Sequence, residues 1–193
     1  MELVILGKGP TWPLGVDVAK RQGCELWTLN NAWQRPGVRE LATAVFEMHK
    51  WSLDEHYKAY LAYNPVHTLS CPVYMQERFA DVPTAVRYPI EEMTRLFGVS
   101  YFNNTICYML ALAIARERYR TIHLFGVDYR QEHREEREYE RPCTEFWIGQ
   151  GMARGINFSL PSATSIFTFA EGVRCLYGYD RRLKDGVSPM ANG

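Results

Sequence analysis

Polar side chains follow several short apolar runs of this 193-residue chain, each at the point where the run ends. Short apolar runs bounded by Gly, Pro or Asn are typical of buried strands. In an open parallel sheet the carboxyl ends of the strands meet at one edge, and ligands bind there. We therefore expect the residues after these runs to form one site: Gly7, Lys8, Gly9, Pro10, Thr11, Asn30, Asn31, His49 and Asp128.

The first of these loops has the composition of an anion site. Gly7 and Gly9 let the backbone approach an anion closely, a helix start behind them supplies N–H donors, and Lys8 can pair with a phosphate. The order Gly-Lys-Gly-Pro is neither the dinucleotide fingerprint nor the P-loop pattern, so a plain strand-to-helix turn is the alternative interpretation.

Two pairs of small polar residues offer further ligand contacts. The amides of Asn30 and Asn31 can read a nucleobase or a sugar, or can close an Asx turn after the strand. Asn104 and Thr105 stand where a long helix begins, a position that suits both a helix cap and an anion site.

Catalytic candidates come from three titratable residues. His49 at a strand end suits acid–base work near neutral pH, or a structural bond to the backbone. Asp128 can bind a ribose hydroxyl, a metal or a catalytic water, but no second carboxylate has metal-site spacing, so no metal site is predicted. Glu145 either activates an acceptor or stabilises a helix start, and Arg141 beside the cleft is a candidate anion clamp.

These residues must be positioned by alternating strands and helices. Strands are expected at 3–6, 25–29, 42–46, 72–75, 121–127 and 156–160, and helices at 14–22, 52–63, 91–97, 104–118 and 144–154. This alternation predicts an α/β fold with a mostly parallel sheet in a single domain, residues 1–179, followed by a loosely ordered tail, residues 180–193. The polar stretch 130–141 is expected to cover the cleft as a lid.

Composition narrows the class of protein. The 22 basic and 22 acidic residues balance, which argues against a generic nucleic-acid binder, and 47% hydrophobic residues indicate a folded globule. We find neither an apolar run of about 20 residues nor a secretory signal, so we expect no membrane partner and a cytoplasmic location. The five cysteines lie too far apart for a zinc knuckle and are expected to be reduced.

Four segments taken together resemble the sequence motifs of a known protein superfamily: residues 4–11 (VILGKGPT), 29–30 (LN), 105–115 (TICYMLALAIA) and 122–129 (IHLFGVDY). They are similar to the Rossmann-like superfamily that holds short bacterial sialyltransferases, motility accessory factors of flagellin glycosylation and the archaeal 6-hydroxymethylpterin diphosphokinase. Residues 46–49, 72–75, 138–149 and 155–162 resemble small bacteriophage-encoded proteins of that superfamily. The likeness covers roughly residues 3–179 and implies a single-domain, three-layer Rossmann-like fold.

The resemblance implies a nucleotide- or nucleotide-sugar-dependent transferase of the glycosyltransferase kind. In the sialyltransferases the matching positions hold a cytidine nucleotide, which here puts Lys8, Gly9, Asn30 and Thr105 at the ligand. The chain departs from that pattern at Lys8, where Asn is usual, at Thr105-Ile106, where Ser-Gly is usual, and in lacking a counterpart of the later catalytic histidine.

The expected ligand is thus a small nucleotide, preferably of the cytidine type, with no tightly bound cofactor and with magnesium dependence left open. Two alternatives stay open: a non-catalytic phage accessory protein that keeps the cleft, and a transferase of pyrophosphate or phosphate from ATP. A phage origin would place the protein in the host cytoplasm, and a homo-oligomer is left open.

Overall fold

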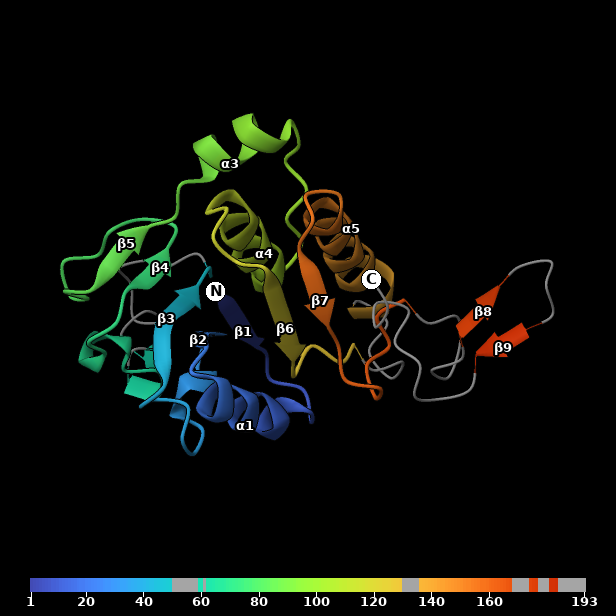
Figure 1. Ribbon diagram of the computed structural model, residues 1–193. Coiled ribbons are helices and arrows are strands. Elements are labelled where there is room, and N and C mark those ends of the chain that lie inside the picture. Colours follow the sequence, from blue (N-terminus) through green and yellow to red (C-terminus); the bar gives the residue numbers. More distant parts are fainter. Residues whose placement is uncertain (50–58, 61, 130–135, 168–173, 177–180, 184–193) are drawn as a thin grey trace.

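The computed structural model describes residues 1–49, 59–60, 62–129, 136–167, 174–176 and 181–183. Its centre is a sheet of seven strands that all run parallel, in the order β5-β4-β3-β2-β1-β6-β7 (Figure 1). These strands are β1 (Glu2–Leu6), β2 (Glu25–Leu29), β3 (Ala42–Glu47), β4 (Val73–Met75), β5 (Ala85–Arg87), β6 (Thr121–Phe125) and β7 (Asn157–Ser159). The helices are α1 (Trp12–Gln22), α3 (Ile90–Phe97), α4 (Thr105–Ala115) and α5 (Arg141–Met152). The predicted single-domain, Rossmann-like α/β fold is confirmed.

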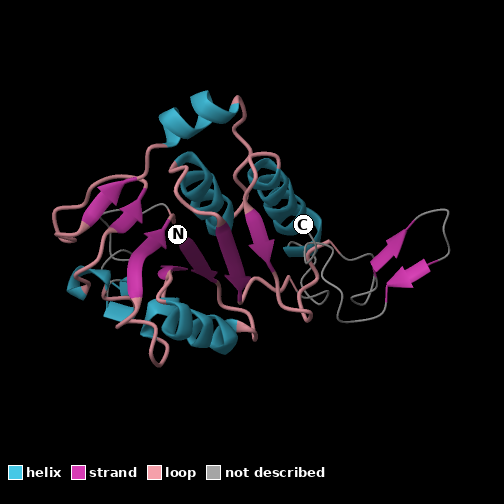
Figure 2. Ribbon diagram, viewed as in Figure 1, coloured by secondary structure: helices cyan, strands magenta, loops and turns pink. Residues whose placement is uncertain are grey.

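The sheet is covered on both faces, as Figure 2 shows. Successive residues of a strand point to opposite faces. In β1, Leu3 and Ile5 join the core formed with α4 and α5, whereas Val4 and Leu6 join the core under α1. The continuous apolar run of β1 is explained by this double burial.

The strand order places a crevice beside β1. From β1 the chain moves outward through β2 and β3 to β5, and it then returns by α4 to enter β6 on the other side of β1. The carboxyl ends of β1 and β6 therefore flank the point where the direction of winding reverses, which is where ligands bind in open α/β sheets.

Several boundaries differ from the sequence expectation. Strand β5 was not predicted, because it has only three residues and Val86 and Arg87 are exposed, which gives no apolar run. The strand expected to reach Val127 ends at Phe125, since Gly126 adopts a left-handed backbone with φ of +66°. The helix expected to reach residue 118 ends at Ala115, and Glu117 has a positive φ of 52°.

The predicted lid and tail are only partly described. Glu136–Glu140 form a π-helical turn that runs directly into α5, so α5 begins three residues before the expected start at Thr144. Residues 130–135 of the expected lid lie outside the described residues. The same is true of residues 52–58 and 61 of the helix expected at 52–63, whose residues 59–60, 62 and 63 are helical. In the segment expected to be a loose tail, β9 (Arg181–Leu183) pairs antiparallel with β8 (Arg174–Leu176).

None of the helices in the described part of the chain has the length and apolar content needed to span a bilayer.

Candidate functional site

A cavity of about 880 Å³ opens at the carboxyl ends of β1, β2, β3 and β6. This volume is within the usual range of small-molecule sites. Nine of the thirteen predicted site residues line it: Gly7, Lys8, Gly9, Pro10, Asn30, His49, Asn104, Thr105 and Asp128. The other four, which are Thr11, Asn31, Arg141 and Glu145, do not contribute to its lining.

The glycine loop packs tightly against the loop that follows β6. The N–H of Gly7 donates to Phe125 O at 2.8 Å, and the N–H of Gly9 donates to Gly126 O at 2.7 Å. A Cβ at Gly7 would lie 2.2 Å from Gly126 O, and one at Gly9 would lie 2.3 Å from Asp128 Oδ2. The two glycines therefore admit the neighbouring loop, and their N–H groups are used inside the protein.

The anion at the start of α1 is the carboxylate of Asp128. Its Oδ1 accepts from Thr11 Oγ1 at 2.7 Å and its Oδ2 accepts from Thr11 N–H at 3.1 Å. Thr11 Oγ1 also accepts from the N–H of Gly126 at 2.8 Å. Because a helix start attracts negative charge, this arrangement satisfies the N-terminus of α1 without a ligand. Thr11 is thus buried behind the loop, not exposed in the cavity.

The start of α4 faces the cavity differently. Asn104 is its cap: Oδ1 accepts from Cys107 N–H at 3.1 Å, and Nδ2 donates to Tyr129 Oη and Glu140 O, both at 3.1 Å. The N–H groups of Thr105 and Ile106 have no acceptor within the described residues, and both residues line the cavity. The capping interpretation therefore holds for the Asn104 side chain, while the helix start still offers two donors.

Asn30 places an unpaired acceptor beside the cavity. Its backbone is left-handed with φ of +48°, a conformation that Asn tolerates better than most residues, and its N–H donates to Phe46 O at 2.9 Å. Its Oδ1 is buried and has no donor in the part of the chain described here. Asn31 contributes only a long contact, from Nδ2 to Tyr63 Oη at 3.5 Å, and lies outside the lining.

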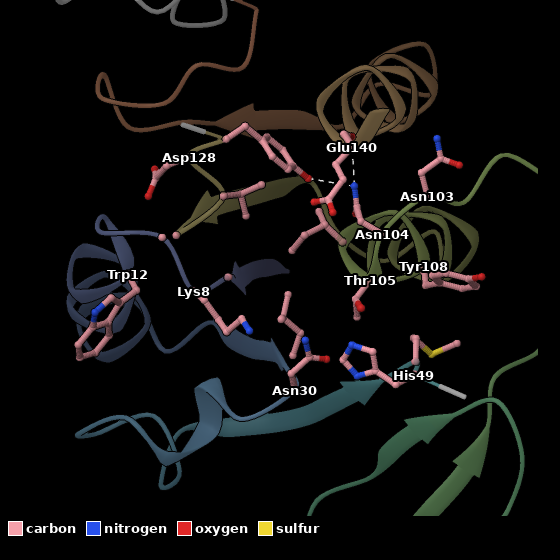
Figure 3. Close-up of a pocket in the computed structure, with 18 of the residues that line it drawn as sticks. Lys8, Trp12, Asn30, His49, Asn103, Asn104, Thr105, Tyr108, Asp128 and Glu140 are labelled. Carbon is pink, nitrogen blue, oxygen red and sulfur yellow. Dashed lines mark hydrogen bonds between the residues drawn. The ribbon is translucent and has the colours of Figure 1, made fainter. Parts of the chain in front are cut away.

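Lys8 and Arg35 make one side of the cavity cationic. The Nη2 of Arg35 donates to Lys8 O at 2.7 Å, and its guanidinium stacks over the Trp12 ring at 4.9 Å. Arg35 Nη1 is buried without a hydrogen-bond partner among the described residues, and burial lowers the pKa of this guanidinium. Figure 3 shows Lys8 reaching toward Asn30 and His49. Arg35 was not predicted, because nothing in the residues around it marks a ligand contact.

His49 is held by a buried glutamate that the sequence reasoning left out of the site. The Glu47 side chain is 0% exposed, and His49 Nδ1 lies 2.5 Å from its Oε1. The other oxygen accepts from Tyr60 Oη at 2.5 Å and from Asn64 Nδ2 at 3.0 Å. Asn64 is fixed in turn by Trp33, whose Nε1 donates to Asn64 Oδ1 at 2.7 Å. The sequence feature that could have identified Glu47 is its position as the last residue of an apolar strand.

The Glu47 carboxylate changes the acid–base behaviour of His49. The hydrogen bond to Glu47 raises the pKa of the imidazole, against the opposing effects of burial and of the nearby Lys8. Because Nδ1 faces Glu47, Nε2 is the nitrogen left for a ligand, and His49 lines the same cavity as Thr105 and Asn30. This arrangement suits a group that donates a proton or pairs with an anion.

The far end of the cavity is aromatic. Phe102 and Tyr108 stack with ring centroids 4.7 Å apart, and both line the cavity together with Met48. The cavity thus joins a cationic side to an apolar end, a combination that suits an amphiphilic ligand such as a nucleotide.

Arg141 and Glu145 pair with each other at the start of α5. Arg141 Nε lies 3.5 Å from Glu145 Oε1, which also accepts from the N–H of Phe167 at 2.8 Å. Glu145 therefore holds the chain at Phe167 against α5. The structure does not bring it together with His49 and Asp128 in the cavity lining.

One group of three potential metal ligands occurs within the described residues, and it lies away from the cavity. It consists of Glu2, Cys24 and His123, whose ligand atoms are within 4.8 Å of one another near the amino ends of β1 and β2. His123 Nε2 already lies within hydrogen-bond distance of Glu2 Oε2, at 3.2 Å, so this buried histidine has a partner inside the protein.

Comparison of the chain with protein families, with curated proteins and with solved structures finds no match.

Proposed function

We propose that the cavity binds a nucleotide or nucleotide sugar and that the protein is a transferase that uses it as the activated donor. The observation that carries this proposal is the convergence of Lys8, the open start of α4 and the Glu47–His49 pair on one cavity at the reversal point of the sheet. The resemblance of residues 4–11 and 105–115 to the Rossmann-like superfamily favours the same ligand class.

The phosphates are assigned to the start of α4, where two backbone donors are open. Thr105 N–H and Ile106 N–H supply donors at a positive helix end, and Lys8 supplies a charge. The start of α1 is a poorer phosphate site, because Asp128 occupies its donors. In this respect the proposed binding mode differs from the usual placing of a pyrophosphate on the first helix of the fold.

The buried Oδ1 of Asn30 calls for a donor from the ligand. An exocyclic amine of cytosine or adenine, or a sugar hydroxyl, satisfies it, whereas a carbonyl at the same place leaves two acceptors facing each other. This requirement supports cytidine or adenosine nucleotides over uridine nucleotides if the base lies there.

His49 is the group we assign to the chemistry. With its pKa raised, the ring is protonated over a wider pH range, so Nε2 pairs with the leaving phosphate and donates a proton to it. Glu47 is a positioning residue that holds Nδ1, and Asp128 positions the glycine loop through Thr11.

Calorimetric titration tests the binding step. CMP, CDP, UDP, GDP and ATP are each titrated with and without magnesium into the wild type, Lys8→Ala and Lys20→Ala. We expect micromolar binding of at least one nucleotide, weakened about tenfold or more by Lys8→Ala because a charge-assisted hydrogen bond is lost. Lys20→Ala removes the same charge from an exposed position of α1 outside the lining and should leave the affinity unchanged. No binding of any nucleotide would contradict the proposal.

A binding protein without turnover is the second candidate, and the engagement of Asp128 favours it. Both Asp128 oxygens are bonded to Thr11 and Glu145 lies outside the lining, so two of the three predicted catalytic residues are not placed to act on a ligand. Release of free nucleotide from CMP-, UDP- and GDP-sugars, followed by chromatography, separates the candidates. Turnover that is lost in His49→Gln while nucleotide affinity persists supports the transferase; binding with no release in the wild type supports the second candidate.

A further inference from the structure

Two buried thiols of the central core are in contact. The Sγ atoms of Cys107 and Cys143 lie 3.1 Å apart, and both residues are 0% exposed. Both are free cysteines. A disulfide bond is about 2.05 Å long, so the sulfurs need to approach by only about 1 Å to become bonded.

The two thiols are held there by different helices. Cys107 is in the first turn of α4 and Cys143 is in the first turn of α5, 36 residues later in the chain. Cys143 Sγ donates to Tyr101 O at 3.3 Å and accepts from the N–H of Asn103 at 3.4 Å. The pairing is therefore fixed by the packing of α4 on α5 and not by closeness in sequence.

The surroundings of the two sulfurs differ in a way that suits thiol chemistry. The hydrogen bond from Cys107 lowers the pKa of the Cys143 thiol, whereas burial raises the pKa of Cys107 well above its ordinary value. Because Cys107 Sγ and Asn103 N–H both donate to its sulfur, Cys143 is the thiol of the pair that ionises more readily.

We propose that Cys107 and Cys143 are a redox modification site, at which a hydroperoxide converts the two thiols into an intrachain disulfide. Cys143 thiolate attacks the peroxide, breaks the O–O bond and becomes a sulfenic acid, and the leaving oxygen departs as water or alcohol after taking a proton. The Cys107 sulfur then attacks the Cys143 sulfur, and the sulfenic hydroxyl leaves as water with the Cys107 proton. The two sulfurs lose two electrons in total, which reduce the peroxide, and a small thiol reverses the change.

The bond would tie together two parts of the cavity wall. Asn103 and Asn104 line the cavity, the first bonded to Cys143 Sγ through its N–H and the second bonded to Cys107 N–H through its Oδ1. The disulfide therefore lies directly behind residues that shape the candidate site, whatever ligand that site takes.

Peptide mapping of the native full-length chain tests the proposal. The wild type is treated with hydrogen peroxide at stepwise concentrations, unfolded in the presence of an alkylating reagent that blocks all free thiols, and digested without reductant. We expect a peptide pair joined through Cys107 and Cys143, with a mass two hydrogens below the sum of the two separate peptides. The total number of free thiols should fall from five to three. Dithiothreitol should restore the five thiols.

The variants Cys143→Ser and Cys71→Ser separate this pair from general oxidation. Cys71→Ser removes a partly exposed thiol elsewhere and should still give the linked peptides, whereas Cys143→Ser should give none. Since the wild-type map needs no variant, the test holds even if Cys143→Ser fails to fold. Loss of thiols without the 107–143 link, or oxidation of Cys24 and Cys71 while Cys107 and Cys143 stay reduced, would overturn the proposal.

Discussion

Asp128 and Thr11 are joined by two hydrogen bonds across 117 residues of sequence. Thr11 donates its backbone N–H to Oδ2 at 3.1 Å and its hydroxyl to Oδ1 at 2.7 Å, and the carboxylate is buried. The pair fastens the loop after β1 to the loop after β6 at the point where the sheet reverses its winding. Asp128 thus performs at the start of α1 the role that a bound phosphate performs in many nucleotide-binding folds.

Breaking this pair should destabilise the protein. Thr11→Val removes the hydroxyl and leaves Asp128 Oδ1 and the N–H of Gly126 unsatisfied, so we expect a loss of about 2–3 kcal/mol in the free energy of unfolding, measured with urea. Thr11→Ser keeps the hydroxyl and should lose much less. Asp17→Asn, an exposed change on α1, should stay within about 0.5 kcal/mol. Equal stability of Thr11→Val and the wild type would show that the pair contributes nothing.

Gly9 should tolerate no side chain. In Gly9→Ala the new methyl group meets Asp128 Oδ2 at 2.3 Å, and relief of that contact breaks the bonds to Thr11, so we expect a loss of about 1–3 kcal/mol or more. Gly149→Ala is the matched control, because a Cβ there meets nothing within 4 Å and Gly149 lies inside α5. That change should stabilise the protein by about 0.5–1 kcal/mol. Thermal unfolding followed by circular dichroism compares the two, and a Gly9→Ala variant as stable as Gly149→Ala would contradict the close approach.

The titration of His49 should depend on Glu47. The pKa of His49 lies above its ordinary 6.5 because Glu47 binds Nδ1, and Glu47→Gln should return it toward that value. Since the folded-state pKa is the higher one, the stabilising pairing is fully present below pH 6.5 and is lost as the pH rises through the raised pKa.

Proton NMR of the imidazole resonances, recorded as a function of pH, measures the pKa of His49 in the wild type and in Glu47→Gln. Glu40→Gln, an exposed glutamate outside the cavity lining, serves as the control and should leave the His49 titration unchanged. An unshifted His49 resonance in Glu47→Gln would rule out the assigned positioning role of Glu47.

Asn64 should be important for stability although it lies outside the cavity lining. Asn64→Ala removes a donor from the buried Glu47 carboxylate and the acceptor of the Trp33 indole N–H, so we expect a loss of about 2–4 kcal/mol. Asn157→Ala, at an exposed position of β7, should change the unfolding free energy by no more than about 0.5 kcal/mol. Urea unfolding followed by tryptophan fluorescence provides the comparison, and similar midpoints for the two variants would contradict the role given to Asn64.

The sequence by itself determined the elements that carry strong local signals. The apolar runs of β1, β2, β3 and β6 end where polar residues begin, and the helix α4 begins at the capping residue Asn104. Because parallel strands end at a common edge, these signals also brought nine of the predicted site residues to one cavity. The short strand β5 was not predicted, since three residues are too few to show a hydrophobic pattern.

Only the tertiary structure decided which polar groups face the cavity and which face each other. Glu47 meets Asn64, Thr11 meets Asp128 and Cys107 meets Cys143 across separations of 17, 117 and 36 residues, and no local preference encodes such contacts. Each depends on the register of neighbouring strands, the packing of helices and the direction of one side chain. For that reason a carboxylate expected to act on a ligand is instead the internal partner of Thr11, and a glutamate left out of the predicted site positions His49.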